Sequence, residues 1–379
     1  TAASAFQYAT MGGIAAGALL LGFVADRLGR KRTIVAGLAL YGAASLVFAV
    51  GNGFGTFVLL LGVSGLGISV FKIGALALVG DVSASTGSHT RFMNTIEGFF
   101  AVGAIVGPAI VATLIARGLS WKWLYVVAAA ICVLLVVMAS RVRYPPTQAS
   151  VERADLKQMV AVLRDPLALG ASALVMLYVA VEVAIYVWMP TYLQGYDGSI
   201  AWLPVYALTI FFVLRAAGRF VGAWLLARVE WKAALVLCSL AILLCFAGSL
   251  VLGVANAAWL LPLSGLFMSI VYPTLNSKGI SCFPKTQHGA AAGVILFFTA
   301  AAAAFGPLAM GAVSDAYGTT RAGFVLATGF ACLLVAGLLG NWLLDPMRRR
   351  LQAADREDYG ARQPAAREWP AGGAADAPK

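Results

Sequence analysis

Long apolar runs, separated by short polar connectors, occupy most of the chain. Each run has about 20 residues, the length that an α-helix needs to cross the hydrocarbon core of a bilayer. The runs are rich in Ala, Leu and Gly, and they lack the in-and-out alternation of barrel strands. The pattern predicts an all-α membrane protein with about eleven transmembrane helices, at residues 3–24, 33–50, 55–79, 92–116, 121–140, 167–193, 200–226, 233–254, 258–282, 289–312 and 322–344.

Composition agrees with a chain embedded in lipid. Of the 379 residues, 61% are hydrophobic and only 11% are charged, which excludes an ordinary soluble globular protein. The net charge of +11 comes from Lys and Arg in the connectors and not from one basic face. This placement is typical of cytoplasmic loops and excludes a nucleic-acid-binding surface, so the lipid bilayer is the expected partner.

The basic residues predict how the chain crosses the membrane. Connectors that contain Lys and Arg alternate with connectors that are almost free of charge, and the basic ones are expected on the cytoplasmic side. We therefore expect a multi-pass protein of the cell (inner or plasma) membrane, whose first run enters from outside and whose C-terminus is cytoplasmic. An odd number of helices with this orientation leads us to expect one further helix ahead of the first run.

The longest polar connector divides the runs into five and six. Inside it, Leu156, Met159, Val160 and Leu163 have the spacing of one helix face, which predicts an amphipathic helix on the inner membrane surface. A solvated linker helix is the alternative. The predicted parts are an N-terminal bundle at 1–140, a cytoplasmic linker at 141–166, a C-terminal bundle at 167–344 and a disordered cytoplasmic tail at 345–379.

The two halves repeat each other weakly. Residues 103–108 (GAIVGP) in the fourth run are similar to residues 303–307 (AAFGP) in the tenth. Repeated halves around a linker are typical of secondary transporters that rock around a central site.

A charge-dense connector, Gly22-Phe-Val-Ala-Asp-Arg-Leu-Gly-Arg-Lys31, joins the first two runs. Its glycines allow close backbone approach, Asp26 can cap the N-terminus of a facing helix, and its basic residues stay at the level of the headgroups. We interpret the connector as a latch between the halves on the inner side, with a topology anchor as the alternative. The predicted latch residues are Gly22, Asp26, Arg27, Gly29, Arg30 and Lys31.

This connector resembles the signature loop of the major facilitator superfamily, which lies between helices 2 and 3 of a twelve-helix fold. The resemblance implies two pseudo-symmetric helical bundles, with about eleven of the twelve helices present here. It also implies that the chain starts at the helix that precedes the loop.

Three stretches in the second half resemble the fucose–galactose–glucose:proton symporter family, at residues 218–225, 267–274 and 306–318. The motif Asn94-x-x-Glu97-x-Phe99 in the first half is similar to that family's fifth helix. The resemblance implies a secondary active transporter that takes up a hexose (glucose, fucose or galactose type) with a proton by alternating access. It further implies that Asn94 lines the sugar cavity and that Glu182 faces it. The acid of the family's first helix has no counterpart here, and Lys72 stands near the place where an acid is expected in the fourth.

Charged residues inside the predicted spans are each costly unless they face a cavity or a partner, and four of them have carboxylate and cation partners at matching depths. Their depths along the helices pair Lys72 with Glu97, and Glu182 with Arg215. A carboxylate beside a cation stays charged until the pair is disturbed, which can couple sugar binding to proton uptake. Static structural pairs are the alternative.

Aromatic and amide side chains supply the predicted sugar surface. A pyranose needs flat apolar platforms and a few polar groups that orient its hydroxyls. Trp188 can equally be an interfacial belt residue. The predicted surface comprises Tyr178, Tyr186, Trp188, Tyr272 and Asn276.

Two other functions remain open: a proton-driven efflux antiporter, because Gly103-x-x-x-Gly107-Pro108 resembles the antiporter motif, and a transport-dead sensor. An enzyme is not expected, since His89 and His288 lie in predicted inner loops without a nucleophile or metal spacing nearby. The five cysteines lie in apolar runs, so we expect no metal, no disulfide and no cofactor. We expect a monomer driven by protons, with sodium as the alternative coupling ion.

Overall fold

The structure is a computed structural model, and it describes residues 2–145 and 156–359. Within these ranges every regular element is a helix. Ten of the described helices are long and apolar enough to cross a membrane, and Ala5–Leu21 forms a shorter apolar helix. The predicted all-α membrane fold is therefore confirmed.

The first half contributes one bundle. In it α3 packs against α4 and α6, and α1 packs against α4. The short α2 lies in the connector between α1 and α3. The helices of this half are α1 (Ala2–Leu21), α2 (Val24–Leu28), α3 (Arg30–Val50), α4 (Phe54–Val82), α5 (Thr86–Ala116) and α6 (Trp123–Arg141).

The second half forms the other bundle, in which two of the spans are interrupted. One span runs through α8 (Pro166–Val183), a π-helical segment η1 (Ala184–Trp188), α9 (Met189–Tyr192) and η2 (Leu193–Gly195). Another breaks between α12 (Val254–Met268) and α13 (Val271–Ser281). The remaining spans are α10 (Leu203–Leu225), α11 (Trp231–Val251), α14 (His288–Tyr317), which follows η3 (Lys285–Gln287), and α15 (Thr320–Leu344).

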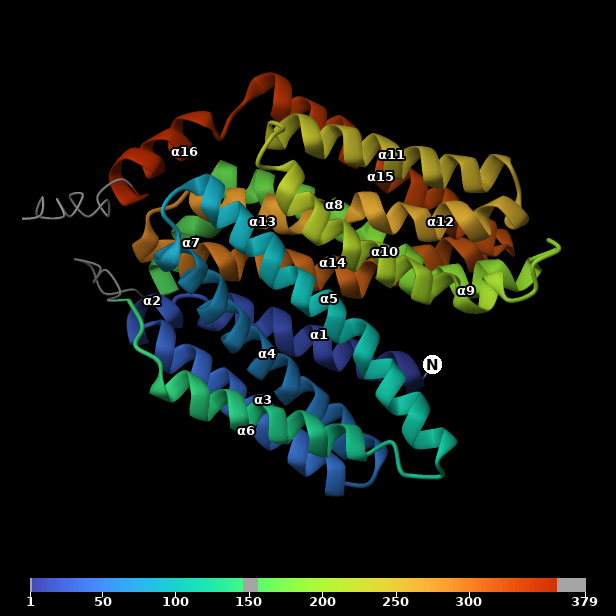
Figure 1. The fold of residues 1–379 in the computed structure, drawn as a ribbon, viewed down its shortest axis with the longest axis horizontal. Helices are drawn as coiled ribbons and strands as arrows, with labels where there is room; N and C mark the ends of the chain where they lie inside the picture. The colour runs from blue at the N-terminus through green and yellow to red at the C-terminus, as the bar shows by residue number, and fades with distance from the viewer. Residues whose placement is uncertain (1, 146–155, 360–379) are drawn as a thin grey trace, which may run out of the picture.

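The halves meet along two seams (Figure 1). At the first seam α1 packs against α14. At the second, α5 crosses away from the other helices of its own half and packs mainly on α10 and α13. The connector helix α2, the linker helix α7 (Leu156–Arg164) and α16 (Arg348–Ala354) all lie at one end of the molecule, called here the α2 end; α9 lies at the opposite end, the α9 end.

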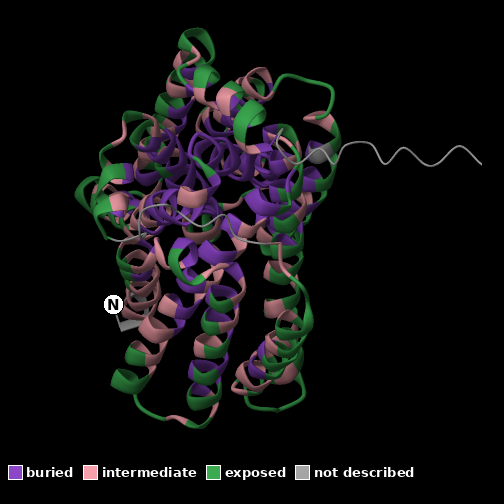
Figure 2. Ribbon diagram, turned by 90° about the vertical axis from the view of Figure 1, so that its left-hand side faces the viewer, coloured by how far each residue is buried: buried purple, intermediate pink, exposed green. Residues whose placement is uncertain are grey.

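Buried residues concentrate in the second half and along the seams (Figure 2). The first half is more open, and α6 buries only Ala129 and Cys132. Apolar side chains that cover the outer faces of such helices suit a lipid environment.

The linker helix differs in part from its prediction. Met159 and Val162 are buried against the protein, whereas Leu156 and Val160 are exposed, so the predicted apolar stripe is divided between two surroundings. Packing against α14 and α8 accounts for the buried part.

The predicted disordered tail is wrong for its first residues. Residues 348–359 form α16 and the π-helical η4 (Asp355–Tyr359), called here the C-terminal strap. Leu351, Ala354 and Tyr359 are buried, and this apolar anchoring holds the strap at the α2 end. Residues 146–155 and 360–379, with Arg153 of the linker, lie outside the described residues.

Candidate functional site: a charge cluster between the halves

A cluster of charged side chains lies where α4, α5, α8 and α10 approach one another. Lys72 Nζ lies 3.4 Å from Glu97 Oε1, and the Arg215 guanidinium pairs directly with the Glu182 carboxylate. Both ion pairs predicted from the sequence are confirmed. Because each pair joins neighbouring helices of the same half, these contacts alone do not show a role in transport, which stays a prediction.

Arg219 is a fifth member of the cluster that was not predicted from the sequence. It lies one turn after Arg215 on α10 and is completely buried. Its Nη1 donates to the backbone oxygen of Glu97, and its Nη2 lies 3.5 Å from Glu97 Oε2, so it links α10 to α5 across the second seam. Two arginines at i and i+4 in one apolar run were the available signal.

The break between α12 and α13 provides acceptors for this cluster. Pro273 has no N–H, so the carbonyl of Ser269, four residues earlier, lacks its usual helical partner. Arg219 Nε donates to that carbonyl over 3.4 Å. The Tyr178 hydroxyl lies 2.9 Å from the carbonyl of Met268 and 2.8 Å from Glu182 Oε1. The interrupted helix therefore helps to place both Arg219 and Tyr178.

Aromatic rings border the charges. The rings of Tyr178 and Tyr272 are 6.3 Å apart, and Lys72 Nζ lies over the Tyr272 ring at 5.4 Å, a cation–π distance. Tyr186 and Trp188 lie on the π-helical segment η1, directly after Glu182, and both are partly exposed. π-Helical turns inside α-helices are frequent at functional sites. Three of the predicted aromatic residues, Tyr178, Tyr186 and Tyr272, thus lie beside the cluster, whereas Trp188 lies against Gly311 of α14.

The two predicted asparagines occupy different surroundings. Asn94 Nδ2 donates to Thr90 O and to Thr274 Oγ1, so Asn94 bridges α5 and α13 within the second seam. Asn276 is buried on α13, and its Oδ1 has no hydrogen-bond partner. Asn94 therefore lies in a closed contact between the halves, and the side-chain oxygens of both asparagines have no hydrogen-bond partner among the described residues.

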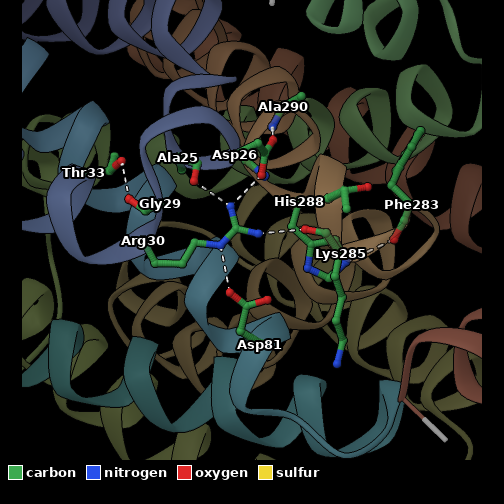
Figure 3. Close-up of polar contacts among 12 residues, drawn as sticks. Ala25, Asp26, Gly29, Arg30, Thr33, Asp81, Phe283, Lys285, His288 and Ala290 are labelled. Atoms are coloured by element: carbon green, nitrogen blue, oxygen red, sulfur yellow. Dashed lines mark hydrogen bonds and ion pairs between the residues drawn. The ribbon is translucent and has the colours of Figure 1, made fainter. Parts of the chain in front are cut away.

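The predicted latch closes the α2 end at the first seam (Figure 3). Asp26 accepts hydrogen bonds from the amides of Gly289 and Ala290, at 3.0 and 2.9 Å, so it caps α14 as predicted. A Cβ on Gly289 would lie 2.8 Å from Asp26 Oδ2, so the cap needs glycine there. The gating role of this contact stays a prediction.

Arg30 ties four segments together at the same place. Its guanidinium contacts Asp26 Oδ1 at 2.6 Å, Asp81 Oδ2 at 2.9 Å and the carbonyl of Lys285 at 2.7 Å. The last contact crosses to the second half. Two other predicted latch residues take no part in this contact between the halves. Lys31 donates to Ser140 O within its own half, and Arg27 is exposed.

The prediction that both histidines lie in loops is wrong. His89 lies in the first turn of α5 and His288 begins α14, and both are fully buried. His89 Nδ1 lies 2.6 Å from Ser277 Oγ, and the two imidazole rings are 5.9 Å apart. Long-range packing of α5 on α13 brings them into the closed α2 end.

The C-terminal strap adds a third link between the halves. Asp355 accepts from the backbone amide and the hydroxyl of Thr86, at 2.7 and 2.9 Å, at the N-terminus of α5. Arg350 Nη2 lies 2.7 Å from Asp165 Oδ2. The strap follows the second half in sequence and holds a helix of the first.

The chain is similar in sequence to known transport proteins. Residues 1–307 match the sequence profile of the Major Facilitator Superfamily. The glucose/galactose transporter of Brucella abortus biovar 1 (strain 9-941) is 25% identical over 338 residues, 84% of this chain and 81% of that protein. The multidrug transporter protein MdtP of Bacillus subtilis (strain 168) is 24% identical over 122 residues, 32% of this chain and 22% of its own length.

Among solved structures, the transporter FucP in its outward conformation has a similar fold. Its TM-score is 0.74, at 22% sequence identity, with 89% of each chain covered. At this identity the likeness concerns the fold.

Proposed function

The chain belongs to the Major Facilitator Superfamily, and from that premise we propose that it takes up a hexose-type sugar together with a proton by alternating access. Family membership and ten apolar helices make it a multi-pass membrane transporter and not an enzyme. The sugar, the coupling ion and the direction are the proposed part.

The observation that carries the proposal is the buried Glu182–Arg215 pair beside Tyr178. Separating this pair would leave a buried carboxylate without its counter-charge, which is costly unless the carboxylate takes up a proton. A solute that draws Arg215 away from Glu182 therefore couples its own binding to protonation. The tyrosines supply the flat apolar surfaces that a sugar ring needs.

Relatives support sugar transport as the substrate class. The Brucella protein is named a glucose/galactose transporter, and it aligns with most of this chain. FucP, whose fold this chain shares, is described as a fucose:proton symporter.

The α2 end is proposed to face the cytoplasm. It carries the exposed basic residues Arg27 and Arg32 and the three arginines that begin α16, as the positive-inside rule requires. The contacts of Asp26, Arg30 and Asp355 would then shut the cytoplasmic side, and transport would require all three to break.

Uptake into proteoliposomes tests the proposal. Purified full-length protein is reconstituted, and uptake of labelled glucose, galactose and fucose is measured with and without an inward proton gradient. Acceleration by the gradient, abolished by a protonophore, is the expected result. Acceleration by a sodium gradient instead would assign the other ion, and no uptake of any of the three sugars would contradict sugar transport.

Proton-driven efflux is the second candidate. Matches to MdtP and the antiporter-like Gly103-x-x-x-Gly107-Pro108 favour it. In the structure, α5 continues as a helix through Pro108. A Cβ built at Gly103 or Gly107 would meet no other described helix within 4 Å, so these glycines do not serve close helix packing. Extrusion of ethidium from cells that express the protein, without sugar uptake, would favour efflux.

A further inference from the structure

We propose that His89 and His288 form a second proton-binding site, at the α2 end, which takes up protons when that end opens and must release them before it closes. Acid on that side would therefore hold the two halves apart. Of the proposed function, this site requires only that the α2 end opens during alternating access. The chain contains just these two histidines, so their titration can be followed without interference from others.

Each histidine makes a contact between the halves. His89 lies on α5 of the first half, and its Nδ1 is 2.6 Å from the hydroxyl oxygen of Ser277, on α13 of the second half. His288 begins α14 of the second half, and a Cβ built on Gly80 of α4 would overlap its Nδ1. The imidazole of His288 thus fills space that a glycine of the first half leaves. Opening of the α2 end separates both rings from these partners and admits water to them.

Hydrogen bonding in the closed state does not accommodate a second proton on either ring. His288 Nε2 lies 3.1 Å from the carbonyl oxygen of Phe283, which can only accept, so this nitrogen carries the proton of the neutral ring. His288 Nδ1 and His89 Nε2 are buried and have no hydrogen-bond partner among residues 2–145 and 156–359. An imidazolium has an N–H on both nitrogens, so protonation of either ring would bury a donor without an acceptor, which is costly.

Cationic side chains act on both rings. The charged groups that act most strongly on His89 are Lys278 of α13 and Lys285 of η3, and those that act most strongly on His288 are His89, Arg30 and Lys285. Both rings are fully buried. Burial and neighbouring charges of the same sign each disfavour a positive charge. The closed α2 end therefore requires both imidazoles to be neutral.

The carboxylates at the first seam already bind a cation (Figure 3). Asp26 and Asp81 both pair with the Arg30 guanidinium, at 2.6 and 2.9 Å, and Asp26 also caps α14. A protonated His288 would have to displace Arg30 to pair with either of them. The latch thus holds the negative charge of this end away from the histidines.

The C-terminal strap contributes the other acidic groups of the α2 end. Asp355 interacts electrostatically with Lys278, and Asp358 with Lys285, whose Nζ lies 4.2 Å from the centre of the Tyr359 ring. Burial raises the pKa of the Asp358 carboxyl above its usual 3.8. Asp358 is therefore a rival source of any response to acid, and it needs a control of its own.

Proton uptake and opening are linked, because only the open state accepts the protons. A histidine that stays neutral in the closed state and titrates near its ordinary value of about 6.5 in the open state favours opening about tenfold between about pH 7.5 and about pH 5.5. An acid cytoplasm would then keep the α2 end open and prevent the empty transporter from returning. Proton-driven uptake would limit itself in this way.

Double electron–electron resonance between spin labels at Arg32 and Glu230 measures the opening. Arg32 lies in the first turn of α3 and Glu230 directly before α11, on opposite halves near the α2 end, and both are exposed. The full chain is purified through a tag without histidine, with its five native cysteines replaced. The ratio of open to closed molecules should rise about tenfold or more between about pH 7.5 and about pH 5.5. Distances that do not change with pH overturn the inference.

Glutamine variants identify the titrating groups. Glutamine is neutral at every pH and still forms hydrogen bonds, so His89→Gln combined with His288→Gln is expected to abolish the response to pH. Asp358→Asn, which removes the rival carboxyl and keeps both histidines, is the matched control and should retain it. A response that persists without the histidines, or that disappears in Asp358→Asn, overturns the inference.

NMR of histidine-labelled protein tests the same point without any variant. Two histidines give two sets of imidazole signals, and both rings should gain protons over the pH range in which the α2 end opens. Protonation of the rings in the closed protein overturns the inference. Proton-driven sugar uptake without pH-dependent opening would leave the proposed function standing and sink this inference. Opening that follows the histidines, without sugar uptake, would do the reverse.

Discussion

Glu182 has partners on two helices: Tyr178, one turn earlier on α8, and Arg215 on α10. Glutamine keeps the shape of this side chain and removes its ability to carry a proton. Glu182→Gln is therefore expected to lose proton-driven accumulation by about tenfold or more while solute exchange between the two sides continues. Uptake and proton flux in proteoliposomes measure both activities.

Glu230→Gln is the control for Glu182. Glu230 is exposed at the start of α11, and its ion pair among residues 2–145 and 156–359 is with Lys232, 2.8 Å away, so its loss should leave coupling unchanged. Full proton coupling in Glu182→Gln would show that the buried pair is structural.

Asp26 caps α14 and pairs with Arg30, so we expect closure of the α2 end to depend on it. Asp26→Asn removes the charge that faces Arg30 and the N-terminus of α14, and a hydrogen bond to a charged group contributes about 1.5–3 kcal/mol. We expect the α2 end to open more often. Gly289 is not a suitable position for a cysteine that reports this opening, because any side chain there displaces Asp26.

Cysteine placed at the buried Ser277 reports on closure instead, in a protein whose five native cysteines are replaced. Asp26→Asn should raise its alkylation rate several-fold. Arg27→Gln, next to Asp26 and exposed, is the matched control, and equal rates in the two variants would mean that Asp26 does not hold the latch.

The C-terminal strap and the start of α8 form an element-scale link outside the membrane-spanning segments. Asp165 caps α8 through the amides of Leu167 and Ala168 and binds Arg350. Burial tends to raise the pKa of the Asp165 carboxyl, but the bond from Arg350 and the two amide bonds outweigh it and hold the pKa below its usual 3.8.

A lowered pKa fixes the sign of the pH dependence. The stabilisation of the folded protein by the Asp165 carboxylate is fully present above the usual pKa of an aspartate. It is lost as the pH falls through the lowered pKa that Asp165 has in the folded protein. We expect Asp165→Ala to lower stability by about 1 kcal/mol at neutral pH, and we expect this difference from the parent protein to shrink as the pH falls below the usual pKa of 3.8. Thermal unfolding from neutral pH to well below that value measures the difference; a constant difference throughout would contradict the assignment.

At the scale of elements, local pattern predicted the helices but not their interruptions. Pro273 leaves the carbonyl of Ser269 without its helical partner, and that carbonyl accepts from Arg219, which lies on another helix. The π-helical segment that presents Tyr186 and Trp188 has no equivalent signal in the sequence. These features depend on contacts with α10 and α15, which a single helix cannot reveal.

At the scale of the molecule, all the links through Asp26, Arg30 and Asp355 lie at the α2 end. Alternating access requires the α9 end to close when these links break. Spin labels at Arg117 and Arg321, exposed residues on opposite halves near the α9 end, should move closer when substrate and a proton gradient are supplied. Double electron–electron resonance measures this distance, and the same pair with substrate omitted is the control; an unchanged distance in a transporting protein would exclude rocking of the halves.

The sequence by itself determined the spans, the division into halves, the cap formed by Asp26 and the pairing of Glu182 with Arg215. These follow from hydropathy and from position along a helix, which are properties of the chain read locally. Only the tertiary structure decided that α5 leaves its own half, that Arg219 joins Glu97, that the histidines are buried and that the strap reaches Thr86. Each of these depends on which helices face one another, because the free energy of burying a charge or a ring is set by partners distant in the sequence.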